Sequence, residues 1–148
     1  MPQLSHKLTL SNLNFKAANT MTNLEMVSAL YRDFLLREPD EAGVNYWAGV
    51  LDSGTRDLAS VVDSITASLE FKQQIQPIVD LYNVQLLRPA DPSGLAYWVS
   101  ELRNGLTIEE ISNNFQVSGE FETSVASLDD AAWLNQLYTS VVNRTPDV

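Results

Sequence analysis

Apolar residues recur three and four positions apart along most of the chain, which is the spacing of one buried face of an α-helix. The first such stripe lies within residues 22–37 and consists of Leu24, Val27, Leu30, Tyr31, Phe34 and Leu35. Two more stripes follow it, the first made of Val44, Trp47, Ala48 and Leu51, the second of Leu58, Val61, Val62 and Ile65. Strict alternation of apolar and polar residues beside hairpin turns is not found. The pattern therefore predicts an all-α fold with three helices in each unit.

Capping residues predict where the helices of the first unit begin. Thr22 with Glu25 three residues later has the pattern of a capping box. Asp40 is the predicted N-cap of the second helix, and Thr55 is expected to open the third. We place Arg37 in the last turn of the first helix, where a cation suits the negative end of the helix dipole.

The same signals recur in the second half of the chain. Asp91 is followed by Pro92, which is favoured at the first helical position, and Thr107 with Glu110 repeats the capping-box pattern. Gly54 and Gly105 stand where a left-handed C-terminal cap is expected. Ser68 and Ser118 are predicted to cap the helices that lead into the next unit, and Pro77 to break or kink the first of these connections.

The recurrence of these signals in both halves of the chain reflects an internal repeat. Residues 30–54 match residues 81–105 at a constant offset of 51. The repeat motif of the first copy is Tyr31, Arg37, Asp40, Gly43, Trp47, Gly54 and Phe71, and that of the second copy is Tyr82, Arg88, Asp91, Gly94, Trp98, Gly105 and Phe121. A third copy begins at an offset of 107 from the first with Leu137, Tyr138, Arg144, Pro146 and Asp147.

The repeat predicts four segments. Residues 1–22 form an N-terminal arm, residues 23–76 and 77–128 form helical repeats 1 and 2, and residues 129–148 form the truncated start of repeat 3. We expect the chain to be part of a longer protein, with a naturally truncated third copy as the alternative.

Composition excludes several classes of function. The 9 basic and 19 acidic residues give a net charge of −10, which argues against binding to nucleic acid. Cysteine is absent and His6 is the one histidine, so the sequence offers no cysteine nucleophile and no histidine-rich metal site. The chain has no apolar run long enough to span a membrane. We expect no cofactor.

The motif residues allow two interpretations. Trp47 and Trp98 lie on the apolar stripes and are assigned to the core, with a sugar-stacking platform formed together with Tyr46 and Tyr97 as the alternative. All five tyrosines occupy repeat positions, which favours a packing role.

The pairs Arg37 with Asp40 and Arg88 with Asp91 are assigned to a structural corner, with an ion site as the alternative. Weak calcium binding at Asp40 or at Asp129 has no supporting loop motif, and first-turn carboxylates explain both positions better.

The motif Leu30-Tyr31, Arg37 to Gly43, Tyr46-Trp47, Gly54 and Ser68 to Phe71, repeated from Leu81 to Phe121, resembles the DUF4214 family. The resemblance covers about residues 24–126. It implies a helical module without an assigned activity, found mostly in bacterial exported or surface proteins and often beside RTX-type calcium-binding repeats. A fainter similarity to phycobilisome linker domains is weakened by the acidity of this chain.

From these observations we expect a non-catalytic helical spacer or protein-interaction module of a larger bacterial protein, secreted or attached to the cell surface. A glycan- or peptide-binding module that uses aromatic residues between the repeats is the first alternative, and a linker or scaffold domain is the second. The expected partner is an unidentified protein or glycan.

Overall fold

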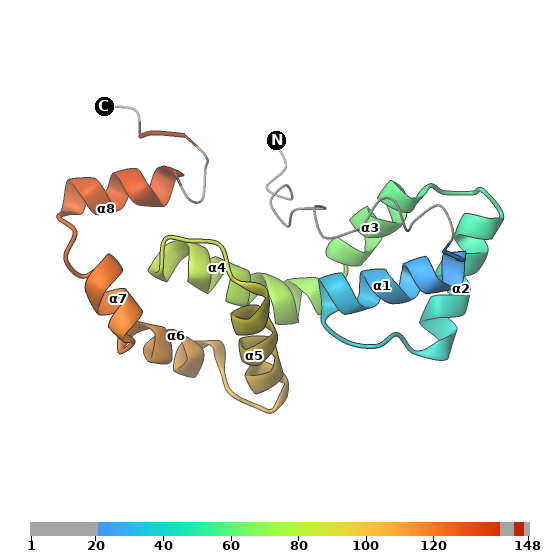
Figure 1. Ribbon diagram of the computed structural model, residues 1–148, viewed down its shortest axis with the longest axis horizontal. Coiled ribbons are helices and arrows are strands. Elements are labelled where there is room, and N and C mark those ends of the chain that lie inside the picture. Colours follow the sequence, from blue (N-terminus) through green and yellow to red (C-terminus); the bar gives the residue numbers. More distant parts are fainter. Residues whose placement is uncertain (1–20, 140–143, 147–148) are drawn as a thin grey trace. The chain divides into compact units, whose positions relative to one another are not determined.

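The fold of the described residues is entirely helical, as the sequence predicts. The structure, a computed structural model, describes residues 21–139 and 144–146. Its elements are α1 (Asn23–Leu35), α2 (Glu41–Asp52), α3 (Leu58–Thr66), a π-helical turn η2 (Phe71–Ile75), α4 (Gln76–Gln85), α5 (Pro92–Arg103), α6 (Ile108–Gln116), α7 (Gly119–Ser124) and α8 (Asp130–Leu137) (Figure 1). No strand occurs in this part of the chain. Most of the predicted N-terminal arm, including His6, lies outside it.

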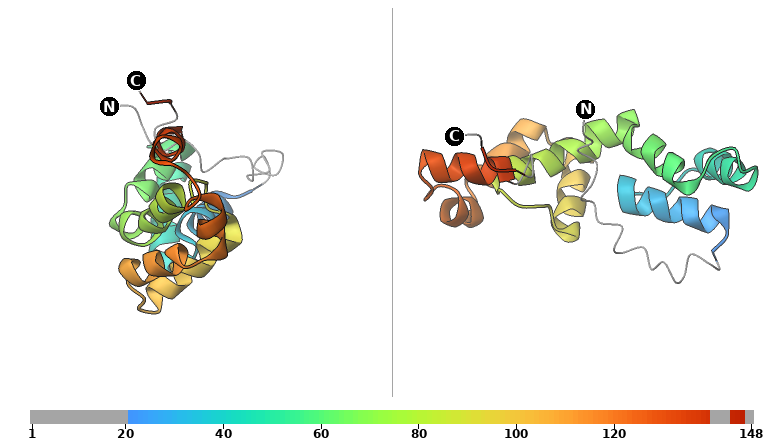
Figure 2. Two further views of the ribbon diagram at one scale, coloured as in Figure 1. Left: turned by 90° about the vertical axis from the view of Figure 1, so that its left-hand side faces the viewer. Right: turned by 90° about the horizontal axis from the view of Figure 1, so that it is seen from above.

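The chain divides into two compact units between Ser68 and Leu69. The first unit contains α1, α2 and α3, coloured blue to green in Figures 1 and 2, and the second contains η2 to α8. Within residues 21–139 and 144–146, every helix is too short or too polar to cross a membrane.

In the first unit, α1 packs against both α2 and α3. Val27, Leu30 and Val61 are at most 1% exposed and form the centre of this unit. The predicted stripe of α1 is confirmed from Val27 onward, but Leu24, in the first turn of the helix, is 47% exposed.

In the second unit, α4 packs against α5 and α6, and η2 packs against both α4 and α5. The most deeply buried side chains are Ile75, Ile78, Val99 and Ile111, each at most 1% exposed. Ile111 occupies the repeat position of Val61, so equivalent residues lie at the centre of both units.

Most predicted N-caps are confirmed. The Thr22 and Thr107 side chains each form a complete capping box. The Asp40 and Asp91 carboxylates accept hydrogen bonds from the N–H groups three residues later, both at 2.8 Å. Asp129 does the same for α8.

The prediction that Thr55 opens the third helix is wrong. Asp57 is the N-cap of α3, and its carboxylate accepts from both the N–H (2.9 Å) and the hydroxyl (2.6 Å) of Ser60. The Thr55 hydroxyl is paired instead with the Ser53 hydroxyl at 2.7 Å. A carboxylate that satisfies two donors is the stronger cap.

The placement of Arg37 in the last turn of α1 is also wrong, because α1 ends at Leu35. Leu36 and its repeat counterpart Leu87 adopt left-handed backbone conformations, with φ of 52° and 53°. The N–H of Arg37 then reaches back to the Tyr31 carbonyl at 3.5 Å, and that of Arg88 reaches Tyr82 at 3.3 Å. This reversal ends the helix and aims the arginine back along it.

The two connections that follow the third helix of each repeat differ. After Ser68 the chain is helical from Leu69 through η2 and α4, and Pro77 lies in the first turn of α4, directly after the π turn. The disruption predicted at Pro77 therefore takes the form of a π-helical turn. After Ser118, the N-cap of α7, the chain forms two separate helices, because it leaves the helix at Val125 and re-enters at Asp129.

The capping box of α6 gives a direct test of this local reasoning. We expect Thr107→Ala to lower the free energy of unfolding by about 1 kcal/mol, because the Glu110 N–H loses the hydroxyl that caps it and the Glu110 carboxylate loses one of its two donors. Thr123→Ala is the matched control, since the Thr123 hydroxyl donates only to carbonyls of its own helix, those of Gly119 at 2.8 Å and Glu120 at 3.2 Å. Urea denaturation followed by circular dichroism measures both, and equal effects would contradict the cap assignment.

Candidate functional site

The repeat motif assembles a corner where the first helix of each repeat turns into the second. In the first unit, the Arg37 guanidinium lies over the Tyr31 ring, 5.1 Å from its centroid. Arg37 Nη1 donates to the Glu38 carbonyl at 2.9 Å and lies 3.9 Å from Asp40 Oδ2. Asp40 Oδ1 accepts from the Gly43 N–H and so begins α2. One arginine thus connects the end of α1 to the start of α2.

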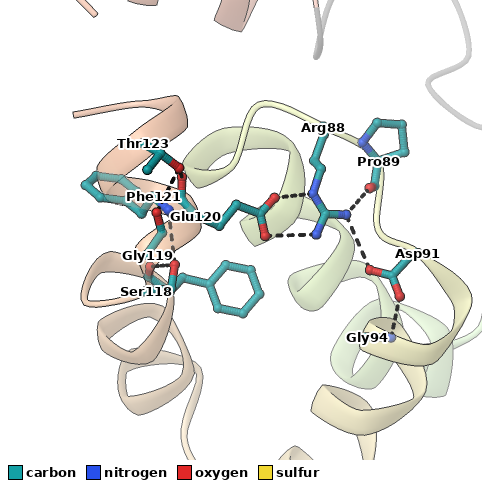
Figure 3. Close-up of polar contacts among 10 residues, drawn as sticks. Arg88, Pro89, Asp91, Gly94, Ser118, Gly119, Glu120, Phe121 and Thr123 are labelled. Atoms are coloured by element: carbon teal, nitrogen blue, oxygen red, sulfur yellow. Dashed lines mark hydrogen bonds and ion pairs between the residues drawn. The ribbon is translucent and has the colours of Figure 1, made fainter. Parts of the chain in front are cut away.

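The second unit repeats this corner atom for atom (Figure 3). The Arg88 guanidinium lies 4.9 Å from the Tyr82 ring centroid, and Arg88 Nη1 donates to the Pro89 carbonyl at 3.0 Å. The same nitrogen lies 3.4 Å from Asp91 Oδ2, while Asp91 Oδ1 accepts from the Gly94 N–H. The Ser93 hydroxyl and the Gly94 N–H together lower the pKa of Asp91 to about 2.

In the third copy, the described residues form the part of the corner that consists of the tyrosine and the arginine. The Arg144 guanidinium lies 5.3 Å from the Tyr138 ring centroid, and Arg144 Nη1 donates to the Thr145 carbonyl at 3.2 Å. Asp147, the sequence counterpart of Asp40 and Asp91, lies outside the described residues.

Glycine is required in the first turn of α2 and of α5. A Cβ atom on Gly43 would lie 2.6 Å from the Tyr31 hydroxyl, and one on Gly94 would approach the Tyr82 hydroxyl even more closely. Both tyrosines are buried, at 7% and 4% exposure, so neither hydroxyl has space to move aside. The tyrosine and the glycine of the motif therefore pack directly against each other.

In the second unit the corner extends to α7. Arg88 Nε and Nη2 bind the two carboxylate oxygens of Glu120, with Nη2 3.1 Å from Oε2 (Figure 3). This bidentate pair lowers the pKa of Glu120 and raises that of Arg88. The repeat counterpart of Glu120 is Glu70, whose carboxylate lies 3.8 Å from Arg103 Nη2. The sequence motif contained both glutamates but did not indicate their partners.

Trp98 contributes its polar edge to the corner. Its indole N–H, which can only donate, lies near the Tyr82 hydroxyl. Burial, followed by the charge of Asp91, raises the pKa of that hydroxyl. The Trp98 ring also packs against Phe115 at a centroid distance of 5.3 Å.

The assignment of Trp47 and Trp98 to the core needs correction, because both are only partly buried. Smaller apolar residues occupy the deepest positions on the same helices, with Ala48 at 3% and its counterpart Val99 at 0% exposure. A large ring with a polar N–H is placed at the border of the core, where the N–H finds a partner.

A packing role for all five tyrosines is likewise wrong for two of them. Tyr46 and Tyr97 are 63% and 56% exposed, and each contacts its neighbouring tryptophan edge to face at 4.9 Å. They are the two largest exposed aromatic rings of the described residues and lie at equivalent positions.

The remaining motif residues are structural. Gly54 and Gly105 have φ of +66° and +107°, which confirms the predicted left-handed stops. Phe71 is buried in the second unit, and its counterpart Phe121 is partly buried. Within the part of the chain that the structure describes, no three potential metal-ligating side chains lie together.

The fold and its corners define a tandem helical-repeat protein. The chain belongs to the family described as Domain of unknown function (DUF4214), which it matches over residues 7–75 and 76–125. The two matched segments confirm the family and its two copies. Neither the curated proteins nor the solved structures give a match to this chain.

The contact between tyrosine and glycine yields a sharp stability test. We expect Gly94→Ala to destabilise the protein by about 1–3 kcal/mol, as overpacking of a tight site does. Gly119→Ala is the control, because a Cβ there meets nothing within 4 Å and alanine favours a helix. Adding Tyr82→Phe should reduce the penalty of Gly94→Ala in a double-mutant cycle measured by urea denaturation; a penalty unaffected by Tyr82 would contradict the contact.

The ion pair between Arg88 and Glu120 predicts a pH dependence. Since the folded state lowers the pKa of Glu120 below 4.5, the pair contributes stability above pH 4.5 that is lost as the pH falls through the lowered value. Near neutral pH, Glu120→Gln should cost about 1 kcal/mol or less, because both side chains are partly exposed. The difference from the unsubstituted protein should vanish in acid.

Glu122→Gln on the same helix is the control, because Glu122 is exposed. Urea denaturation of the three proteins across the acid range supplies the measurement. A Glu120→Gln difference that is constant with pH, or one reproduced by Glu122→Gln, would show that the ion pair does not stabilise the fold.

Proposed function

We propose that this chain is a non-catalytic helical module that serves as a spacer or protein-interaction element of a larger protein. One observation carries the proposal: the tyrosine, arginine, aspartate and glycine repeated in each copy contact one another within the corner. Arg88, for example, contacts Tyr82, Asp91 and Glu120 at once. Side chains engaged in this way hold helices in place, which supports a structural role for the motif.

The setting of the module is part of the proposal. The resemblance noted from the sequence supports an exported or cell-surface protein of bacteria, in which such modules accompany calcium-binding repeats. The net charge of −10 and the absence of cysteine accord with that setting. In the part of the chain that the structure describes, the ionisable groups whose pKa values are shifted lie at helix caps or in the corner of the second unit. The pKa of Glu110, for example, is lowered by the Thr107 N–H and hydroxyl.

Catalytic turnover would overturn the proposal. The purified chain is assayed against panels of ester, phosphoester, glycoside and peptide substrates, with Asp91→Asn and Glu120→Gln as variants. We expect no turnover above that of the heat-unfolded protein. Turnover that is abolished by either substitution, while the variant keeps its helical circular dichroism, would assign an active site to the corner.

A second candidate function rests on the exposure of Tyr46 and Tyr97. Each ring stands on the surface of its helix, supported by a tryptophan, at the same repeat position. An exposed, rigidly held aromatic ring suits stacking against a sugar or a peptide side chain.

A glycan array separates the two functions. If the module is a spacer, the array should show no specific signal. A signal lost in Tyr46→Ala/Tyr97→Ala, but retained in the control Val117→Ala, whose side chain is 83% exposed, would favour the ligand-binding module.

A further inference from the structure

In α8, the residues at the positions that form the core in the first helix of a repeat are not buried. No residue of α8 is buried. Leu134 is 42% exposed, whereas its repeat counterparts Val27 in α1 and Ile78 in α4 are both 0% exposed. Tyr138 is only partly buried, whereas its counterparts Tyr31 and Tyr82 are 7% and 4% exposed. Leu137 is partly buried, as is its counterpart Leu81 in α4.

The two complete units show what covers this face. In the first unit α2 and α3 pack against α1, and in the second unit α5 and α6 pack against α4. In each case the tyrosine hydroxyl lies against the glycine in the first turn of the second helix, and the arginine lies beside that helix's aspartate N-cap.

The half of the corner that belongs to a first helix is already assembled on α8. Arg144 stacks on Tyr138 and donates to the carbonyl of the next residue, as Arg37 and Arg88 do. A surface with this arrangement is shaped before any partner arrives, which lowers the entropy lost on binding.

We propose that the face of α8 formed by Leu134, Leu137 and Tyr138 is a docking surface for a further helical hairpin of the same kind as α2–α3. This inference rests on the proposed role as an interaction module and names its partner. The docked helix follows an aspartate at the position of Asp40 and Asp91, which Asp147 occupies in the third copy, and has glycine in its first turn, so that the Tyr138 hydroxyl can approach its backbone.

The hairpins of a second copy of the chain are not the expected occupant. Gly43 already contacts Tyr31, and Gly94 already contacts Tyr82. A second copy would have to break one of its own corners to cover α8, so the partner is an additional hairpin whose glycine is not occupied.

A fusion protein tests the proposal. Residues 42–76 are added directly after Val148, which places Pro146, Asp147 and Val148 where Pro39, Asp40 and Glu41 precede the original hairpin. Amide hydrogen exchange of α8 is then compared with that of the unfused chain. We expect exchange to slow by about tenfold or more, because helices that gain a packed face open less often.

The control fusion carries Gly43→Leu in the added segment only, where the new side chain would collide with the Tyr138 hydroxyl. Its α8 should exchange nearly as fast as in the unfused chain. A second variant, Leu134→Asp in the first fusion, should abolish the protection as well, because it places a charge in the new interface.

Several outcomes would overturn the proposal: an added segment that gains no helical circular dichroism, an unchanged exchange rate in α8, or equal protection in the Gly43→Leu fusion. Sedimentation of the unfused chain as a dimer with α8 protected would instead make a second copy the occupant. None of these results bears on the turnover assays, so the proposed non-catalytic role is judged separately.

Discussion

At the end of α1, and again at the end of α4, a buried tyrosine lies so close to the next helix that its hydroxyl leaves no room for a Cβ atom. The arginine six residues later folds back over the ring because a leucine, Leu36 or Leu87, reverses the chain in a left-handed conformation. Bulky residues avoid this conformation, so the surroundings must hold it in place. The position of the second helix in each unit depends on this contact.

The same contact explains why the tryptophans lie at the border of the core. Trp98 fills the space between Phe115 and the Tyr82 hydroxyl, and its N–H needs a partner that a purely apolar interior does not offer. The ring is therefore only partly buried, and the neighbouring Tyr97 contacts it edge to face. Exposure of Tyr97 follows from the helical period, because the adjacent position on a helix points away from the buried face.

Local signals in the sequence were sufficient for the helices, the capping boxes and the glycine stops, since each depends on residues within a few positions. The left-handed leucines were not predictable in this way, because leucine has no intrinsic preference for that conformation and adopts it through tertiary packing. The partner of Glu120 was likewise hidden: Arg88 lies 32 positions earlier, and only the folded second unit brings them together. The burial of Trp47 and Trp98 was overestimated because periodicity identifies a face but not the depth within it.

The two units also differ in the residues that occupy one pair of equivalent positions. Phe34 and Val62 in the first unit correspond to Gln85 and Ser112 in the second, where Gln85 Nε2 donates to the Ser112 hydroxyl. Within the described residues, Gln85 Oε1 is buried without a hydrogen-bond partner, which costs more than an apolar side chain would at that position. The corner is thus kept the same in both units while the packing beside it varies. This difference is what we expect if the corner, rather than any single core residue, determines how each repeat folds.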